Sequence, residues 1–501
     1  MTSLAPPRPS ARGRAAVAVL LLLGFYAIGL LICAVLVALD VWLLSQDRVP
    51  ARLIFATGVV VFALLRGMFF VERRSAADDV NGIEVTEAEE PRLWATIREV
   101  AASLATDPPA HVYLVPDVNA FVFQRSRFMG LVPGERVMGI GVPLLEVLSP
   151  DELRGVLAHE FGHYTGGDTR LGPLVYRGRA SIGRTIHHLG DNVIATVFRA
   201  YGKLYLRVSQ AVSRRQELDA DANAAHLVGS ATHASALRKV HVSAAVFDEF
   251  VDLYAVPLWE NGARPKTLYE GFRRFHDDPE HAEALTKAVA EMAKEAGDRY
   301  DSHPPLGARL AALGDTSTDV EPAPQRAVDL LADAARTDDR MSQLVSRLAA
   351  ESSSLVPVEW DDQAAERMCA PNASSESERL RGAVSRLTGR DARVADALDL
   401  LEQGKVPDLA YAIEPRLAQV PDADRARVGT AVVARALAGT VAAALTTLHG
   451  WRWELRWSGP AALVSPKGKA WDYGTDVFDA VADPAKVPAL RKKLKAYGIP
   501  V

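Results

Sequence analysis

Cysteine is nearly absent from this chain, since its 501 residues include only Cys33 and Cys369. Two such cysteines, one of them inside a long apolar run, make no disulfide framework, which agrees with a reducing compartment. A large excess of either charge is also lacking, because the net charge is −5 and the pI is about 6.2. That balance gives no sign of nucleic-acid binding by the chain as a whole. No internal repeat or long low-complexity tract occurs, and the length suits two or three domains.

Charge is missing altogether from residues 15–39, which are rich in Leu, Val, Ala and Ile. This run exceeds the roughly 20 residues needed to cross a bilayer. A secretory signal peptide is the alternative, but its apolar region is normally only about 7–15 residues long. Residues 53–71 are apolar except for Arg66, whose side chain can reach the interface. The alternative for this second stretch is a buried core helix. Residues 1–76 are therefore predicted to hold a tail and a transmembrane helical hairpin.

Basic residues flank both ends of this hairpin. Three arginines and no acid precede it, two more arginines follow it, and its connecting loop carries another two: Arg8, Arg12 and Arg14; Arg73 and Arg74; Arg48 and Arg52. By the positive-inside rule both ends favour the cytoplasm. We therefore expect a multi-pass protein of the cell membrane whose following domain faces the cytoplasm.

The segment His-Glu-Phe-Gly-His at residues 159–163 is the strongest chemical signal in the sequence. On a helix, His159 and His163 are four residues apart, so both imidazoles project from one face and can bind the same zinc ion. Glu160 lies beside them, where it can take a proton from an attacking water. The alternative is a chance pattern in which two histidines serve only packing or the surface.

Local signals place this segment on a helix. Ser149 is a suitable N-cap, the proline after it suits the first helical position, and Glu152 completes an S-x-x-E capping box. Gly166 and Gly167 are expected to end the helix after the second histidine. The two histidines should therefore share one helical face.

A peptidase zinc needs three protein ligands and one open position for water. The best candidate for the third ligand lies in residues 213–224, where Glu217 and Asp221 are four residues apart on one helical face. Glu217 can reach the metal, and Asp221 can accept a hydrogen bond from the far nitrogen of a ligating histidine. Ala220 and Ala224 are small, which would let this helix approach the first one closely. The alternative is a solvated acidic helix face.

Together these motifs resemble the membrane zinc peptidases of the HtpX and CAAX prenyl protease type. Four ordered segments carry the resemblance: His-Glu-Phe-Gly-His, the S-R-x-x-E-x-x-A-D-x-x-A pattern of residues 213–224, Asn119-Ala120-Phe121, and His303-Pro304-Pro305 with Arg309. The third resembles the edge strand that pairs with substrate backbone in this family, and the fourth its H-P-P-x-x-x-R segment. The resemblance covers roughly residues 75–315, and four motifs in order are more specific than one.

The resemblance implies a gluzincin fold and endopeptidase activity with one catalytic Zn²⁺ per chain. His159, His163 and Glu217 would bind the metal, and Glu160 would act as general base and then pass its proton to the leaving amine. The motif also places Asp221 behind a ligating histidine, where it would orient the imidazole ring.

Two further roles follow from the same resemblance. His303 and Arg309 become candidates for stabilising the oxyanion that develops on the substrate, although His303 could instead be a loop histidine that serves packing. Asn119, Ala120 and Phe121 would bind substrate backbone by β-augmentation, which favours extended or unfolded polypeptide.

Residues 170–215 are strongly basic, with nine Lys or Arg against the single acid Asp191, a net charge of 9 − 1 = +8. The HtpX pattern has further membrane spans here. In this chain the longest uncharged run within residues 192–215 is only seven residues, 192–198, so no span fits. The segment suits contact with an anionic leaflet, and a basic solvated helix over the active site is the equally open alternative.

The C-terminal third shows no catalytic constellation. We expect residues 231–300 to form helices along the cleft and the polar stretch 314–325 to be a linker. Residues 431–448 are predicted as a packed Ala-rich helix, with a third membrane span as the alternative. Residues 451–457 alternate strictly between Trp or Leu and charged residues, which indicates a half-buried strand with its tryptophans in a core. A nucleic-acid platform is the alternative for that strand.

The sequence thus predicts an α+β protein in three parts: residues 1–76 with two transmembrane helices, residues 77–316 as a mostly helical zincin (gluzincin) domain, and residues 317–501 as an α/β accessory domain. The expected function is a membrane-anchored zinc endopeptidase in quality control or processing of membrane-associated or unfolded proteins. Its expected partners are a polypeptide substrate and the lipid bilayer, with no nucleic acid, and nothing indicates an oligomeric state. A catalytically inactive polypeptide-binding scaffold and a site-specific protease regulated by its C-terminal domain are the alternatives.

Overall fold

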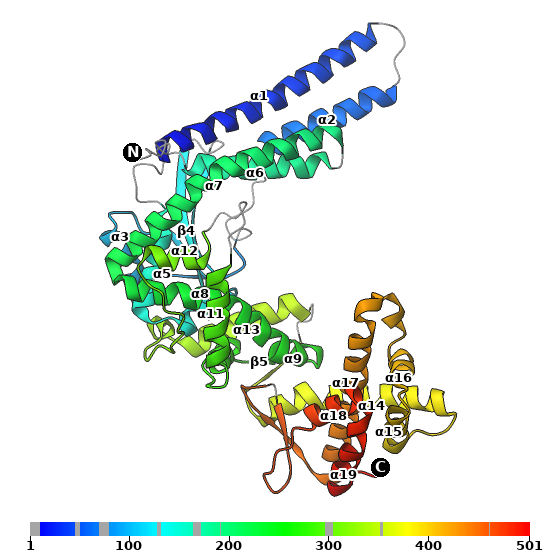
Figure 1. Cartoon of the computed structure of the whole chain (residues 1–501). Helices are drawn as coiled ribbons and strands as arrows, with labels where there is room; N and C mark the ends of the chain where they lie inside the picture. Colours follow the sequence, from blue (N-terminus) through cyan, green and yellow to red (C-terminus); the bar gives the residue numbers. More distant parts are fainter. Residues whose placement is uncertain are drawn as a thin grey trace, which may run out of the picture. The chain divides into compact units, whose positions relative to one another are not determined.

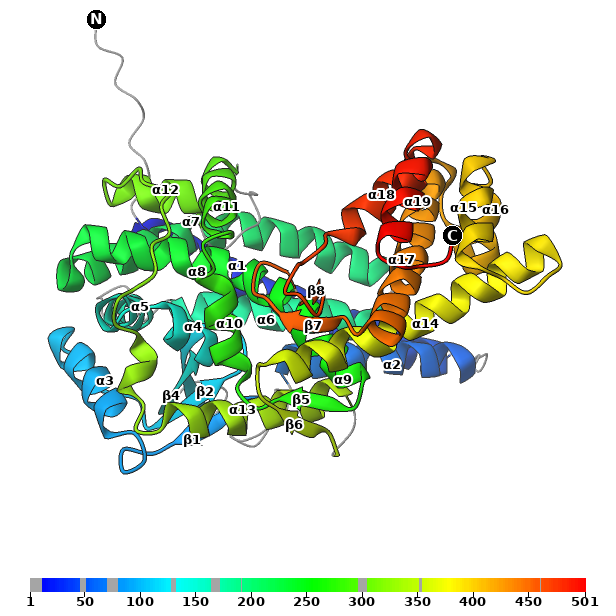
Figure 2. The same ribbon diagram turned by 90° about the horizontal axis from the view of Figure 1, so that it is seen from below.

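The computed structural model describes residues 11–45, 51–69, 80–127, 132–163, 172–190, 192–295, 304–350, 354–459 and 461–501 (Figures 1 and 2). The chain divides into two compact units, and each is built from two segments. The first unit comprises Met1–Ala245 and Ala282–Ala334, and the second comprises Val246–His281 and Ala335–Val501. The sequence suggested one boundary near residue 316, whereas each of these two units consists of two separate segments.

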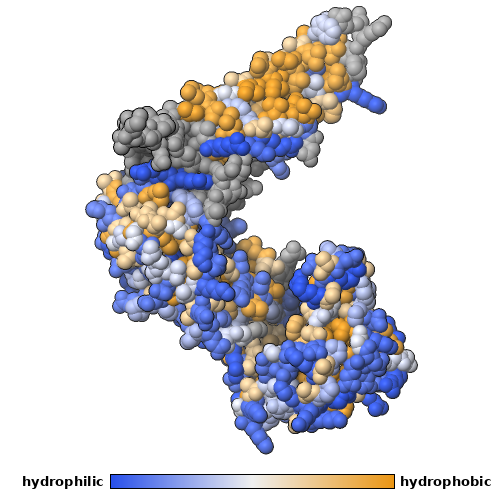
Figure 3. All heavy atoms as spheres, viewed as in Figure 1, coloured by the Kyte–Doolittle hydropathy of each residue, from blue (hydrophilic) through white to orange (hydrophobic). Residues whose placement is uncertain are grey.

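Two long apolar helices open the first unit, α1 (Ala11–Leu44) and α2 (Ala51–Phe69). Both are long and apolar enough to cross a membrane, over Val19–Leu44 and Arg52–Phe69 respectively. Hydrophobic side chains cover their outer surface (Figure 3). Thr57 Oγ1 donates to Asp40 Oδ2 over 2.6 Å and links the two helices. The expected pair of apolar N-terminal helices is thus present.

Helix α6 (Gly172–Leu189) and the first half of α7 (Val193–Val228) pack against this pair. The shared apolar cluster includes Phe25 of α1, Leu64 of α2, Ile182 of α6, and Phe198 and Tyr205 of α7. The basic segment expected either on a leaflet or over the active site thus buries one face against the apolar helices.

A four-stranded sheet follows in the first unit, with the order β1-β2-β4-β3. Its strands are β1 (Ile83–Val85), β2 (His111–Val115), β3 (Ala120–Arg127) and β4 (Val132–Gly141). Strands β2 and β4 are parallel, and the other neighbours are antiparallel. Strand β3 stands last in this order and is an edge strand. Phe121 lies opposite Gly139, where only a glycine leaves room for the phenyl ring.

Helices α4 (Val142–Val147) and α5 (Pro150–Gly162) contact this sheet. The first unit also contains α3 (Pro91–Ser103), most of α8 (Ser230–Phe250), α11 (Ala282–Lys294) and α12 (Leu306–Ala312). Leu93 and Ile97 of α3 and Leu153 and Leu157 of α5 are fully buried. Contact between α3 and α5 joins these side chains into the core.

The stretch after α12 is not a free linker. Arg238 Nε on α8 donates to the carbonyl oxygen of Asp319 over 2.9 Å, and Ala327 N donates to the carbonyl oxygen of Leu148 over 2.8 Å. Polar, Pro-containing composition suggested a linker, but these long-range hydrogen bonds attach residues 315–334 to the first unit.

The second unit has an aromatic core to which both of its segments contribute. The segment Val246–His281 supplies Phe250, Tyr254 of the π-helical turn η2 (Val251–Ala255) and Phe275 of α10 (Leu268–His276). The segment Ala335–Val501 supplies Trp360 and Trp457. The Tyr254 ring stacks on Trp457 with centroids 5.4 Å apart. Residues 246–281, expected along the cleft, therefore belong to the core of the second unit, because their aromatic partners lie far along the sequence.

The other helices and strands of the second unit surround this core. They are α9 (Val256–Glu260), β5 (Ala263–Pro265), α13 (Ala334–Ala350), β6 (Val356–Val358), α14 (Asp362–Thr388), α15 (Val394–Glu402), α16 (Val406–Ile413), α17 (Asp422–His449), β7 (Arg452–Leu455), β8 (Ala461–Val464), α18 (Tyr473–Ala482) and α19 (Val487–Ala496). The pairs β5-β6 and β7-β8 form two small sheets. Trp451 and Trp453 are buried, which confirms the tryptophan stripe as core.

Helix α17 meets the length and hydropathy requirements for a membrane span, but 50% of its most apolar window is buried within the protein. Its buried side chains, among them Val433, Leu437 and Leu445, pack in a unit where α17 contacts α14, α16 and α18. The expected packed Ala-rich helix is therefore what the structure shows.

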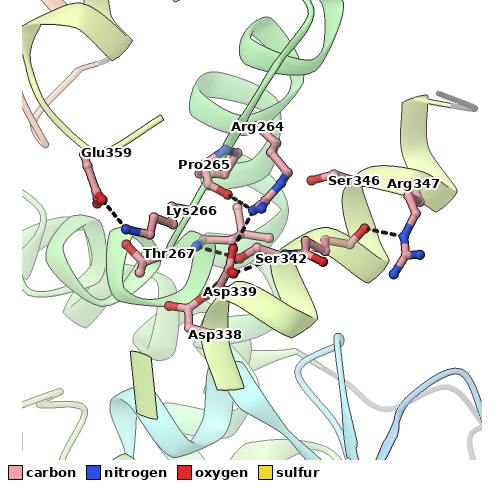
Figure 4. A network of polar contacts seen from close by, with 12 residues as sticks. Arg264, Pro265, Lys266, Thr267, Asp338, Asp339, Ser342, Ser346, Arg347 and Glu359 are labelled. Carbon is pink, nitrogen blue, oxygen red and sulfur yellow. Dashed lines mark hydrogen bonds and ion pairs between the residues drawn. The ribbon is translucent and has the colours of Figure 1, made fainter. Parts of the chain in front are cut away.

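Polar contacts also join the two segments of the second unit (Figure 4). Arg264 Nη1 pairs with Asp339 Oδ1 over 2.8 Å, and Lys266 Nζ pairs with Glu359 Oε1 over 2.7 Å. Asp338 accepts two backbone N–H groups at the start of α10, over 3.1 and 2.9 Å. Burial nevertheless raises the pKa of Asp338 to about 7.

Candidate metal centre

Helix α5 positions the two histidines, and its start forms as the sequence predicts. Ser149 Oγ accepts from the Glu152 N–H over 3.1 Å, and Glu152 Oε2 accepts from the Ser149 N–H over 2.7 Å. This reciprocal capping box satisfies two of the donors that a helix start leaves open. The helix ends at Gly162 with His163 as its C-cap, which is earlier than expected. Gly166 and Gly167 lie outside the described residues.

Glu152 also ties α5 to α8. Lys239 Nζ donates to Glu152 Oε2 over 2.8 Å, and Ser235 Oγ donates to Glu152 Oε1 over 2.6 Å. Both Lys239 and Glu152 are buried. A buried ion pair with further hydrogen bonds of this kind fixes orientation, because any displacement would leave a charge without its partner. The helix that carries the histidines is thus held at its first turn.

Small residues bring α5 and α7 together at the metal-ligating end. A Cβ atom on Gly162 would lie 3.1 Å from Ala220 Cα and 3.2 Å from its Cβ, so a larger residue would push the helices apart. Ala220 and Ala224 are almost completely buried. The close approach expected from these alanines is thus present, and it brings Glu217 beside the histidines.

His159, His163 and Glu217 form one compact group of potential metal ligands. His159 Nε2 lies 3.5 Å from Glu217 Oε2, and His163 Nε2 lies 3.6 Å from Glu217 Oε1. Tetrahedral ligand atoms about 2.1 Å from a zinc ion are about 3.4 Å apart, so this spacing suits one ion between them. The side chains of His159 and Glu217 are 10% and 7% exposed, whereas that of His163 is 29% exposed, so the group is more open at His163.

Asp221 lies behind His159 and is the centre of a buried polar network. Its Oδ1 accepts from His159 Nδ1 over 2.9 Å and from His233 Nε2 over 3.0 Å. Arg309 donates to both carboxylate oxygens, from Nη2 over 2.7 Å and from Nε over 2.8 Å. Because His159 donates from Nδ1 to Asp221, its Nε2 lies on the side of Glu217, where it can bind a metal ion. Asp221 thus has the orienting position that the sequence suggested.

Electrostatics agree with an ionised Asp221. Burial alone would raise the pKa of this carboxyl, but hydrogen bonds from Arg309, His159 and His233 outweigh it and hold the pKa well below its usual range. Burial also acts to lower the pKa of His159, whereas its bonds to Asp221 and Glu217 raise this pKa to about 9 without a metal. The site is therefore rich in negative charge, as a cation site must be.

His233 is a member of the site that sequence reasoning missed. His233 lies in the first turn of α8 and is fully buried. The centroid of its ring is 6.1 Å from that of the His159 ring. Burial lowers the pKa of His233, which agrees with a neutral ring that donates from Nε2 to Asp221. No local pattern marks this residue, because its role arises only when α8 packs against α5 and α7.

The structure does not gather every predicted site residue at the metal ligands. Arg309 bonds both carboxylate oxygens of Asp221, and its Nη2 lies 3.4 Å from His159 Nδ1. His303 lies outside the described residues. Asn119 precedes the edge strand β3, which contains Ala120 and Phe121 and contacts α5. Glu160 follows the first ligand on α5, is half-buried, and adds negative charge near His159.

The fold and this site define a metallopeptidase domain joined to apolar, membrane-type helices. Residues 87–317 match the sequence model of peptidase family M48, so this part of the chain is similar to that family.

Curated relatives point the same way. The chain is 28% identical over 212 residues to the "Protease HtpX homolog" of Burkholderia multivorans (strain ATCC 17616 / 249), covering 38% of this chain and 69% of the relative. It is 29% identical over 180 residues to proteins of the same name from Burkholderia mallei (strain SAVP1) and Burkholderia pseudomallei (strain 668), covering 32% of this chain and 60% of each. The chain thus spans about two thirds of the relatives it matches. No solved structure matches it. The larger segment of the second unit, Ala335–Val501, lies outside the family-model match.

Proposed function

We propose that this protein is a zinc-dependent membrane endopeptidase. The observation that carries the proposal is the compact group of His159, His163 and Glu217, backed by the buried Asp221 network. Two imidazoles and one carboxylate are a ligand set that catalytic zinc sites use. A zinc ion held there would activate a water molecule and polarise the scissile carbonyl group.

The chain's own residues supply the proton transfers. Glu160 follows the first ligand directly on α5, so we assign it to accept the proton of the attacking water and to return it to the leaving amine. Asp221 keeps His159 in the tautomer that presents Nε2, and Arg309 keeps Asp221 ionised. We therefore assign Arg309 a positioning role, and leave the oxyanion-stabilising role proposed for His303 to be tested by His303→Ala.

Strand β3 is the proposed substrate-binding element. An edge strand near α5 can add an extended polypeptide through main-chain hydrogen bonds, with Asn119 just before the strand and Ala120 and Phe121 at its start. Because such binding needs extended backbone, unfolded segments should be cut and folded ones spared. Comparing cleavage of one substrate in its native and denatured forms tests this, and equal rates would count against it.

A change of a single functional group tests the peptidase proposal. Glu160→Gln should keep one zinc per chain but lose about 10²–10⁴-fold in kcat/KM on an unfolded substrate, because only the general base is removed. Asp151→Asn is the matched control, since the same chemical change falls on an exposed position of the same helix. If the unaltered protein and Glu160→Gln both bound zinc but neither cleaved the substrate, the result would favour a polypeptide-binding scaffold. No zinc in the unaltered protein would refute the metal site.

For the biological role, we propose quality control or processing of membrane-associated or unfolded proteins, with the metal centre on the cytoplasmic side of the cell membrane. The arginines that flank α1 and α2 favour this orientation. In intact cells a membrane-impermeant maleimide should label Ser45→Cys, at the end of α1, but not Leu348→Cys in the second unit. The reverse labelling pattern would contradict the orientation.

A further inference from the structure

Contacts between helices show where the α6–α7 hairpin lies along the apolar pair. Tyr26 of α1 stacks on Phe69, the last residue of α2, with ring centroids 5.5 Å apart. The Tyr26 hydroxyl donates to Ser181 Oγ of α6 over 3.4 Å. The end of α2 and the middle of α6 are therefore at the same level of α1.

Beyond that level, the hairpin continues beside the membrane helices. Helix α6 runs in the same direction as α1, since Gly178 lies against Leu22 one turn before Ser181 meets Tyr26. Its remaining eight residues to Leu189 extend about 12 Å at 1.5 Å per residue. The hairpin tip thus overlaps α2 for about two fifths of the roughly 30 Å hydrocarbon thickness.

The outer face of α7 in this region is apolar. Val193, Val197, Ala200 and Leu204 recur at helical spacing and form one stripe along the helix. Three of them are exposed large hydrophobics, with Val193 82%, Val197 49% and Leu204 47% exposed. The stripe is separate from the face that buries Phe198 against α1 and α2. It therefore continues the apolar surface of the two membrane helices around the bundle.

Basic side chains flank the lower part of this stripe. Lys203 and Arg207 are exposed and lie toward the metal-site end of the hairpin, and the half-buried Arg199 lies one turn closer to the tip. Long basic side chains in such positions can place their charge at the headgroup level while their stems lie along acyl chains. Along α7, apolar residues toward the tip and cations toward the base are in the order that insertion into one leaflet requires. On α6, Arg184 lies nearer the tip, half-buried, and donates to Ser181 Oγ over 3.0 Å.

Three hydrogen bonds among the described residues at the tip satisfy backbone groups there. Asn192 Nδ2 donates to the carbonyl oxygen of Leu189 over 2.7 Å, and Asn192 Oδ1 accepts from Ala195 N over 2.8 Å. Thr196 Oγ1 donates to the carbonyl oxygen of Asn192 over 3.2 Å. Internal satisfaction of this kind lowers the cost of removing a turn from water.

We infer that the α6–α7 hairpin inserts into the bilayer beside α1 and α2, in the leaflet on the same side of the membrane as the metal site. Val193, Val197 and Leu204 would lie against acyl chains. The inference rests on the membrane location in the proposed function. The hairpin enters the leaflet without crossing it. Its tip sequence contains His187, His188, Asp191 and Asn192, and neither α6 nor α7 is among the described helices that are apolar enough to span.

This arrangement sets the reach of the metal site. Val197 and Glu217 lie on the same helix, 20 residues apart, which is about 30 Å along its axis. One continuous helix therefore connects the leaflet with a metal ligand. The substrates that fit are polypeptide segments that come within about this distance of the membrane surface.

Spin labelling in a bilayer tests the insertion. In a Cys33→Ala/Cys369→Ala background that still binds zinc and cleaves substrate, single cysteines replace Val193, Val197 or Leu204. Val35, 58% exposed on α1, gives the lipid reference, and Leu348, 60% exposed in the second unit, gives the aqueous one. Each nitroxide-labelled protein is placed in phosphatidylcholine–phosphatidylglycerol vesicles. Its collision rates with oxygen, which concentrates in acyl chains, and with a water-soluble nickel chelate are then compared.

We expect the oxygen-to-nickel ratio to be highest at Val35, close to it at Val193, and lower at Val197 and then Leu204, all above Leu348. Ratios at Val193 and Val197 equal to that at Leu348, with a lipid-like Val35, would overturn the insertion while leaving the membrane helices intact. A water-like Val35 would overturn the membrane location and the insertion together. Zinc binding and cleavage, measured on the same samples, report on the peptidase proposal separately.

Discussion

Neutralising Asp221 should damage both folding and metal binding, because this carboxylate serves several buried donors at once. Asp221→Asn keeps the size of the side chain but removes the negative charge opposite Arg309, which is only 6% exposed. Removing one partner of a buried ion pair typically costs about 3–5 kcal/mol, since the other charge stays buried and uncompensated. His159 would also lose its charged acceptor, and loss of such a partner lowers metal affinity about 10–100-fold.

The two effects are measured separately. Chemical denaturation of the metal-free protein in detergent gives the free energy of unfolding, and competition with a chelator of known affinity gives the zinc affinity. Because hydrogen bonds hold the pKa of Asp221 below its unfolded value, its contribution to stability is present above about pH 4 and is lost as pH falls further. Measurements at pH 7 therefore see the full effect.

Asp219→Asn is the matched control. Asp219 lies on the same helix but is 54% exposed and pairs with Arg215 at the surface, where such a pair contributes only about 0.5 kcal/mol. If Asp221→Asn changed stability and zinc affinity no more than this control does, the network argument would be refuted. Replacing both partners, as Asp221→Leu with Arg309→Met, should be less destabilising than Asp221→Asn alone while zinc affinity stays low. A double variant as unstable as the single one would show that the uncompensated charge is not the cause.

Three further results are expected. His233→Phe should weaken zinc binding, whereas His233→Gln, which retains a donor toward Asp221, should keep most of the zinc affinity. Chelator competition measures both affinities, and equal values in the two variants would contradict the positioning role of His233. Trp457→Ala should destabilise the second unit by about 3–5 kcal/mol, because it empties space against Tyr254 in the aromatic core, yet leave zinc affinity unchanged in the same titration. Since the pKa of Asp338 is raised by burial, the folded state binds more protons, so the second unit should lose stability as pH rises from about 4 to about 7. Asp338→Asn should flatten that slope in thermal unfolding followed across this pH range, and an unchanged slope would exclude Asp338 as its source.

Local sequence patterns were sufficient to predict the central part of the candidate site. The capping box at Ser149 and the i, i+4 spacings of His159/His163 and Glu217/Asp221 depend on the geometry of single helices, so they can be read without tertiary information. The small Ala220 correctly indicated close helix packing. These features are local, and the structure places them as expected.

What the sequence could not show depends on long-range packing. His233 and Arg309 meet at Asp221. The H-P-P-x-x-x-R segment marked Arg309 as a site residue but not its contact with Asp221, and no local pattern marks His233. The charges of residues 170–215 concealed a face, with Phe198 at its centre, that packs against the apolar helices. Residues 246–281 were assigned to the cleft because their helical pattern says that they pack but not against what, and their partner Trp457 is about two hundred residues away.

The two-segment construction of the second unit has a consequence for how the protein is made. Phe275 leaves the ribosome about 180 residues before Trp457, which at about 5–20 residues per second is a delay of about 10–40 seconds. During that interval Phe250 and Tyr254 lack their native ring contacts with Trp457. A nascent chain arrested before Trp457 should therefore bind chaperones that recognise exposed aromatic surface, and synthesis of the last strands should release it.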